Sequence, residues 1–188
     1  MTQIRPYVKI AGMLLLGGVL CGLAFTLMFS ETVERLFATV FASLNQLGET
    51  IFVEQGGVWG SVTLFWHNFR AAMGMAIMGV ALGLYPVLGI TLNGFIVGVV
   101  LALSLMEGQL FVFMIGVLPH GIFEIPALVI AAGAGLYLGW GPLRRPWAGY
   151  RAAFGHVADP LLLASAMLVL AAFIEVGITP LLIARVVP

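Results

Sequence analysis

The feature that most constrains this fold is the near absence of charge over long apolar stretches. From Leu110 to Gly141 the chain has only three ionisable side chains, those of His120, Glu124 and Tyr137. A helix of about 20 apolar residues is long enough to cross the roughly 30 Å hydrocarbon core of a bilayer. A lipid-facing charge at the bilayer centre costs roughly 2.5 kcal/mol or more, so His120 and Glu124 are expected to face protein, a partner or a water pocket.

The whole chain has the composition of a membrane protein. Of its 188 residues 62% are hydrophobic and only 9% are charged, against about 25% charged in a soluble domain. So few charges cannot cover a water-facing surface, and we expect an all-α bundle in lipid. The formal net charge is zero, and no basic run indicates binding to nucleic acid. The single cysteine, Cys21, excludes a disulfide within one chain.

Apolar stretches bounded by turn signals predict five membrane spans in a single membrane domain. Their expected ranges are residues 7–29, 69–84, 87–106, 110–140 and 160–184. Trp59 and Trp66 precede the second span, as interfacial aromatic residues do. The first apolar stretch is longer than the core of a signal peptide, which has about 7–15 residues, so we expect it to be retained as a span.

Residues 31–55 follow a different pattern. Apolar side chains recur there at helical spacing, among them Val33, Phe37, Phe41 and Leu44, and polar side chains occupy the opposite face. The pattern predicts an amphipathic helix on the extracytoplasmic side. Such a helix lies on the membrane surface, packs against a partner chain or packs against its own bundle.

The distribution of basic residues predicts the orientation in the cytoplasmic membrane. With the N-terminus inside, five of the eight Lys and Arg residues lie on the cytoplasmic side: Arg5, Lys9, Arg144, Arg145 and Arg151. Basic residues concentrate on that side of multi-pass proteins. The acidic residues of 31–55 then lie outside.

The fourth span carries signals that predict a broken helix. Proline removes a helix hydrogen bond and clashes with the preceding turn, so Pro119 and Pro126, together with Gly121, favour an interruption in the segment PHGIFE. One interpretation is two half-helices joined by a non-helical link at membrane depth. The other is a single kinked helix with His120 and Glu124 on one face.

Polar side chains within the predicted spans indicate a functional cluster that opens outward. Its expected members have a similar depth in the membrane: His120, Glu124, Glu175, Arg70 and Asn68. Asn93 is assigned to the same set, although it lies nearer the inner face. Ionisable residues inside a membrane usually serve a function.

Several functions are open to His120 and Glu124. An imidazole and a carboxylate can bind zinc with Glu175 or His67 as a third ligand, relay protons, or line a transported-ion site at a broken helix. The structural alternative is a buried pair that only hydrogen-bonds. Zinc is less favoured, because H-x-x-x-E lacks the general base of HExxH. No Ser-His-Asp set stands out, so we assign no catalytic residue and no cofactor.

Pairs of glycines four residues apart recur along the spans. They are Gly18/Gly22, Gly79/Gly83, Gly94/Gly98 and Gly135/Gly139. Such pairs let helix backbones approach closely. Packing within one chain explains them at least as well as a homodimer does, and both interpretations stay open.

Three motifs follow one another along the chain. They are Asn93-Gly94 with Gly98, the block Pro119–Glu124 that runs into a Gly-rich stretch at 130–135, and Ile174-Glu175 followed by Thr179-Pro180. In order and spacing they resemble the stage II sporulation protein M family of integral membrane proteins. The block PHGIFE is the most specific part of the resemblance. His67-Asn68 departs from the paired asparagines that the family often carries there.

The resemblance implies a role without catalysis. The family's namesake belongs to a membrane complex with peptidoglycan-degrading partners that drives engulfment of the forespore, and it is held to scaffold them rather than to hydrolyse. We therefore expect a non-catalytic membrane component that organises envelope-remodelling partners, with residues 31–55 as its docking element. The alternatives are a small transporter or ion pathway at the broken span and, less favoured, a metal-dependent intramembrane hydrolase.

Overall fold

The computed structural model describes residues 2–35, 57–141 and 146–186, and all regular secondary structure in these ranges is helical. The long helices are α1 (Arg5–Met28), α3 (Gly57–Ile77), α4 (Leu84–Met106), α5 (Leu110–Trp140) and α6 (Pro146–Gly177). A short 3-10 helix, η2 (Met78–Val80), extends α3, and the short helix α7 (Thr179–Ile183) follows α6. The predicted all-α class is confirmed.

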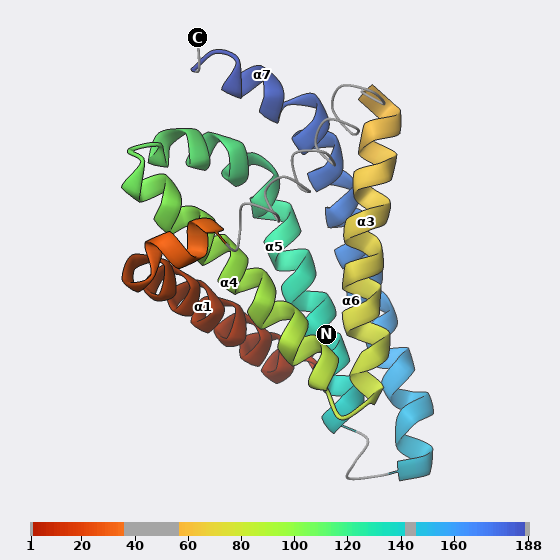
Figure 1. The fold of residues 1–188 in the computed structure, drawn as a ribbon. Helices are drawn as coiled ribbons and strands as arrows, with labels where there is room; N and C mark the ends of the chain where they lie inside the picture. The colour runs from red at the N-terminus through yellow and green to blue at the C-terminus, as the bar shows by residue number, and fades with distance from the viewer. Residues whose placement is uncertain (1, 36–56, 142–145, 187–188) are drawn as a thin grey trace.

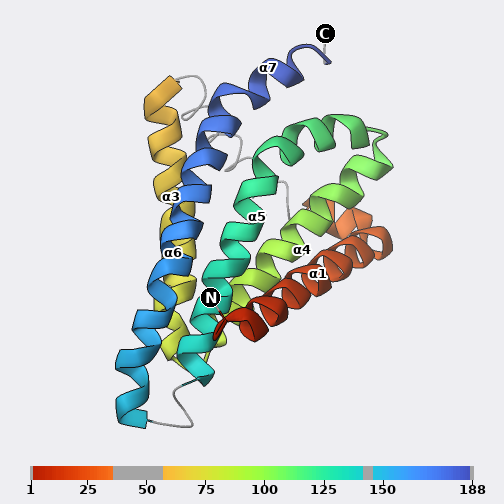
Figure 2. The ribbon, with the colours of Figure 1, turned by 180° about the vertical axis from the view of Figure 1, so that it is seen from behind.

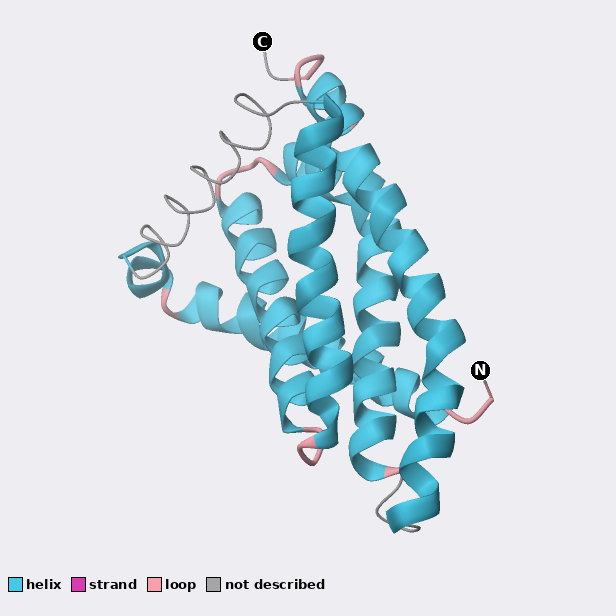
Figure 3. Cartoon of the chain, turned by 90° about the vertical axis from the view of Figure 1, so that its right-hand side faces the viewer, coloured by secondary structure: helices cyan, strands magenta, loops and turns pink. Residues whose placement is uncertain are grey.

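The long helices alternate in direction, and α5 lies between the others (Figures 1 and 2). α1 packs mainly on α4, α3 packs on α6, and α5 contacts all four of these helices. Short turns, drawn like all loops in pink in Figure 3, connect the helices: residues 81–83 precede α4, and residues 107–109 separate α4 from α5. The start of α1, the α3–α4 turn and the end of α5 therefore lie at one end of the bundle (Figure 1).

Four segments are long and apolar enough to cross a membrane: Arg5–Met28, Leu84–Met106, Leu110–Trp140 and Arg151–Ile183. They overlap the first, third, fourth and fifth predicted spans. Helix α3 has 21 residues, roughly 31 Å of helix, but His67, Asn68 and Arg70 lower its mean hydropathy. It is not among the four segments found in the described residues. The fifth crossing stays a prediction.

The limits of the second predicted span differ from those of α3. The helix begins at Gly57, well before the expected start at residue 69, and the chain turns at residues 81–83 rather than at Tyr85-Pro86. Pro86 lies in the first turn of α4. Proline is tolerated there, because the first amide groups of a helix have no partner within it.

The α3–α4 turn depends on two residues in the left-handed region of backbone space. Leu82 has a φ of 56° and Gly83 a φ of 70°. Trp140 Nε1, at the end of α5, donates a hydrogen bond of 2.9 Å to the carbonyl of Leu82. The turn is thus held against the central helix, a contact that local sequence signals do not predict.

The predicted glycine pairs lie where helix backbones touch within the chain. A Cβ at Gly18 would collide with the α4 backbone at Thr91, and one at Gly98 would collide with the α1 backbone at Val19. A Cβ at Gly79 would collide with the α5 backbone at Gly135, and one at Gly139 would collide with the backbone at Gly79. Small residues permit this close approach. Packing within one chain therefore accounts for these pairs.

Helix α5 is continuous from Leu110 to Trp140, with Pro119 and Pro126 inside it. Figure 1 shows its first turns running across the direction of the remainder. Each proline leaves the carbonyl four residues earlier without its helical donor, which bends a helix. The structure thus shows a kinked helix in place of the non-helical link that a broken span predicts.

The predicted amphipathic helix at residues 31–55 falls mostly outside the described residues. Residues 30–35 are helical. The remainder of that helix stays a prediction.

Candidate functional site

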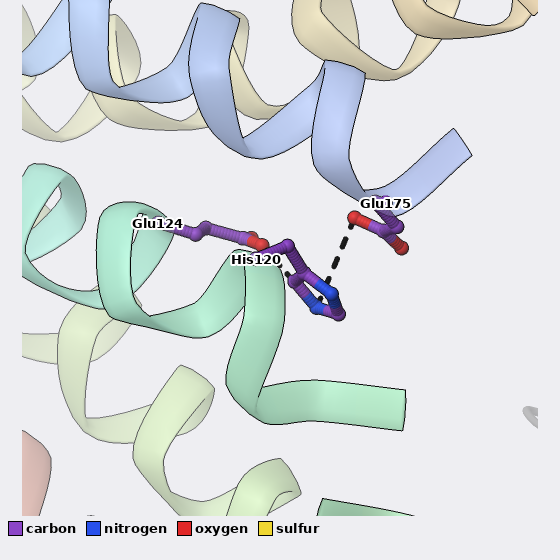
Figure 4. A group of neighbouring side chains, drawn as sticks. All are labelled: His120, Glu124 and Glu175. Carbon is purple, nitrogen blue, oxygen red and sulfur yellow. Dashed lines mark ion pairs between the residues drawn. The ribbon is translucent and has the colours of Figure 1, made fainter. Parts of the chain in front are cut away.

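Three ionisable side chains from two helices meet where α5 passes α6 (Figure 4). His120 Nε2 lies 4.0 Å from Glu124 Oε2 and 3.8 Å from Glu175 Oε2. We call these three residues the His-Glu-Glu cluster. The structure therefore brings together half of the side chains that the sequence assigned to one polar cluster.

Helical spacing and helix packing together build the cluster. Residues four apart lie on the same face of a helix, which places His120 and Glu124 side by side on α5. Glu175 is supplied by α6, which packs extensively on α5. The side chains of His120, Glu124 and Glu175 are 13%, 22% and 22% exposed. His120 lies ten residues after Leu110, roughly 15 Å along the helix, inside a segment apolar enough to span a membrane.

One contact near Glu175 was not singled out from the sequence. Leu64 of α3 packs with Ala172 and Val176 of α6, which lie before and after Glu175 in the sequence. Thr179, which belongs to the motif noted in the sequence, follows Glu175 by four residues and is buried. Its Oγ1 donates a hydrogen bond of 3.4 Å to the carbonyl oxygen of Ile174. No local sequence signal marked Leu64, because its contact joins two different helices.

The His120 imidazole does not hydrogen-bond to either carboxylate of the cluster. Separations of 3.8 and 4.0 Å exceed the roughly 2.7–3.2 Å of an N–H···O hydrogen bond. His120 Nδ1 is buried without a hydrogen-bond partner. Because buried polar groups are nearly always bonded, direct hydrogen bonds between His120 and the two carboxylates do not account for this cluster.

The charges of the cluster also need a counterpart. Among the described residues, no Lys or Arg forms an ion pair with Glu124 or Glu175. Two carboxylates this close in an apolar surrounding repel each other unless a proton or a cation lies between them. The candidate ligand atoms of the three side chains all lie within 4.8 Å of one another. The arrangement can therefore hold a proton or a metal ion.

The other predicted members do not contact the cluster through a hydrogen bond or ion pair in the described residues. Arg70 is exposed and Asn68 is half-buried, and the early start of α3 places both in mid-helix rather than at its outer end. Asn93 Nδ2 donates a hydrogen bond of 2.8 Å to the carbonyl of Gly89 within α4. His67 is exposed as well.

The residues predicted to break the backbone lie within the continuous helix α5. Pro119 directly precedes His120 and lies inside the kinked helix with Pro126. Gly121 is buried, but a Cβ there would only reach Val117 and Ile125 side chains at 3.5 and 3.7 Å. Those are ordinary contacts, so close packing does not explain the glycine.

Four apolar segments and a polar cluster between two of them define an integral membrane protein with a buried polar site. The family model for stage II sporulation protein M matches residues 11–180. The chain belongs to the stage II sporulation protein M family, which confirms the resemblance in its motifs. The matched range covers α3 to α6 completely and most of α1.

The chain is also similar to an uncharacterized protein of Methanocaldococcus jannaschii. The two are 32% identical over 127 residues, which cover 61% of this chain and 67% of the relative. No solved structure matches the chain significantly. These comparisons give the family but no biochemical activity.

Proposed function

We propose that this chain is a non-catalytic component of the cytoplasmic membrane that organises envelope-remodelling partners. The observation that carries the proposal is the family match over residues 11–180, which takes in nearly the whole helical bundle. The family's namesake has a role of this kind beside peptidoglycan-degrading partners. We extend that role to this chain as a scaffold, not as a hydrolase.

The arrangement of charges supports an orientation with the N-terminus in the cytoplasm. Arg5 and Lys9 begin α1, and Arg151 lies near the start of α6, at the same end of the bundle (Figure 1). Basic residues favour the cytoplasmic side. Residues 31–55, which follow α1, then begin on the outer side.

The outer side also offers aromatic surface for a partner. Trp59 is 73% exposed in the first turn of α3, the helix that follows residues 31–55 in the sequence. Aromatic side chains are enriched at protein interfaces. With the apolar face predicted for residues 31–55, Trp59 provides the proposed docking region.

The proposal is tested by placing charge on that apolar face. Replacing Phe37 and Phe41 together by Asp should abolish recovery of envelope-remodelling proteins with the tagged chain after crosslinking in native membranes. Desolvating two carboxylates in an apolar contact is costly. The readout is mass spectrometry of the recovered proteins, with an in-gel assay of their envelope-degrading activity.

The control is the double variant Thr39→Asp with Gln46→Asp, which adds the same charge to the opposite face of the predicted helix. It should recover partners at the wild-type level. If the Phe37/Phe41 variant recovers as much partner protein as the wild type, at equal expression and helix content, the docking role is contradicted.

A further inference from the structure

We propose that the His-Glu-Glu cluster is a binding site for a divalent transition-metal ion, with zinc the best fit, and that the ion joins α5 to α6. The donors are one imidazole nitrogen and two carboxylates, His120 and Glu124 from α5 and Glu175 from α6. Histidine nitrogen and carboxylate oxygen are two of the three ligand types that zinc takes in proteins. The proposal is independent of the scaffold role.

The spacing of the donors is close to that of a zinc site. Ligands at about 2.0–2.2 Å from a tetrahedral zinc ion lie roughly 3.3–3.6 Å from one another. The observed separations from His120 Nε2 are 3.8 and 4.0 Å. The ligand atoms of all three side chains lie within 4.8 Å of one another. Movements of up to about 1 Å therefore bring the atoms into coordination. Rotations about the glutamate side-chain bonds can supply them, because Glu side chains have several rotatable bonds.

The charge of the ion matches that of the cluster. A doubly charged cation bound by two carboxylates and one neutral imidazole forms a group with no net charge. A neutral group is far less costly inside an apolar bundle than two carboxylates alone. A monovalent cation would leave one negative charge uncompensated, so the ligand set favours a divalent ion.

The imidazole distinguishes among divalent ions. Magnesium and calcium prefer oxygen ligands, whereas zinc and its first-row neighbours accept imidazole nitrogen. Three protein ligands leave at least one position for a water molecule or for the second oxygen of a carboxylate. The site is thus expected to prefer zinc to magnesium.

The position of the site gives the ion a mechanical consequence. Two ligands lie just after Pro119 in the kinked helix α5, and the third lies on α6. A metal bound by all three fixes the contact between the two helices near the bend. Binding should therefore raise the resistance of the bundle to unfolding.

The test uses the full chain purified in detergent, freed of metal with a chelator and then exposed to Zn²⁺, Co²⁺ or Mg²⁺. We expect zinc to bind in stoichiometric amount, to raise the thermal unfolding temperature by several degrees, and to bind more tightly than magnesium. Co²⁺ should give the absorption spectrum of a low-coordinate cobalt site. His120→Ala, Glu124→Gln and Glu175→Gln should each weaken zinc binding at least about tenfold.

Glu107→Gln is the matched control, because Glu107 is an exposed carboxylate at the end of α4. This variant should bind zinc as the wild type does. Folded wild-type chain that takes up neither zinc nor cobalt would overturn the proposal, as would metal binding that all three cluster variants retain. If a cluster variant fails to fold, the cobalt spectrum of the wild type and its competition with a chelator test the metal site without that variant.

Discussion

At the scale of single residues, the His-Glu-Glu cluster shows how a polar group is accommodated in an apolar chain. His120 and Glu124 cannot face lipid without a large cost, and α5 turns both toward α6, where Glu175 lies 3.8 Å from His120. Each side chain is mostly buried. The three residues therefore form one unit whose members should depend on one another.

This dependence predicts non-additive substitutions. In the zinc-loaded chain, His120→Ala and Glu175→Gln should each destabilise the bundle, while the double variant should be more stable than the sum of the two effects predicts. Residues that share a site show coupling of about 0.5–3 kcal/mol. The measurement is the unfolding free energy in mixed detergent micelles for all four proteins of the cycle.

The comparison pair is His120→Ala with Glu107→Gln. Glu107 shares no hydrogen bond or ion pair with His120 in the described residues, so these effects should add within about 0.5 kcal/mol. Additive behaviour of His120→Ala with Glu175→Gln would contradict a shared site.

At the scale of helices, contacts between backbones hold the bundle together. α1 and α4 meet through Gly18, Gly22, Gly94 and Gly98, positions at which a Cβ would strike the facing backbone. Lipid chains are as apolar as the side chains of another helix, so the hydrophobic effect does not favour one contact over the other. Close van der Waals packing instead favours helix association in membranes. The glycines thus set the distance between α1 and α4.

Gly18→Ala should therefore weaken the bundle by about 1–3 kcal/mol, the usual cost of overpacking. The added methyl group would collide with the carbonyl oxygen of Thr91 on the facing helix. Gly17→Ala is the control, because a Cβ there meets nothing within 4 Å and alanine favours the helix. Unfolding free energies of the two variants check the prediction, and equal values would show that the glycine contact is not needed.

At the scale of the whole molecule, alternating helix directions place the ends of the helices in two groups (Figure 1). The start of α1 and the α3–α4 turn share one end, and the α4–α5 turn lies at the other. If α3 crosses the membrane as predicted, these two ends face opposite compartments. From the positive residues of α1 we predict that its start lies in the cytoplasm.

Cysteine labelling tests this topology. In a Cys21→Ala background, Gln109→Cys should react with a membrane-impermeant maleimide in intact cells, because it lies in the α4–α5 turn. Thr2→Cys and Ala81→Cys should react only after permeabilisation. All three replaced side chains are exposed, so access depends on the compartment. Labelling of Ala81→Cys in intact cells would show that α3 does not cross.

The sequence by itself determined the class of protein and the position of most helices. Sparse charge excludes a water-facing surface, and apolar length fixes where a chain can span lipid. The i, i+4 spacing of His120 and Glu124 already placed both on one helical face. The motifs identified the family, because they are short runs of residues that can be recognised in the sequence without knowledge of the fold.

Only the tertiary structure decided which distant residues meet. Glu175 joins His120 whereas Arg70 stays exposed, and Gly79 meets Gly135 across two helices. Such contacts depend on the rotation and relative depth of packed helices, and the whole bundle sets these quantities. The start of α3 was missed for a related reason. Its polar residues resemble the end of a span, but the helix continues past them because it packs against α5 and α6.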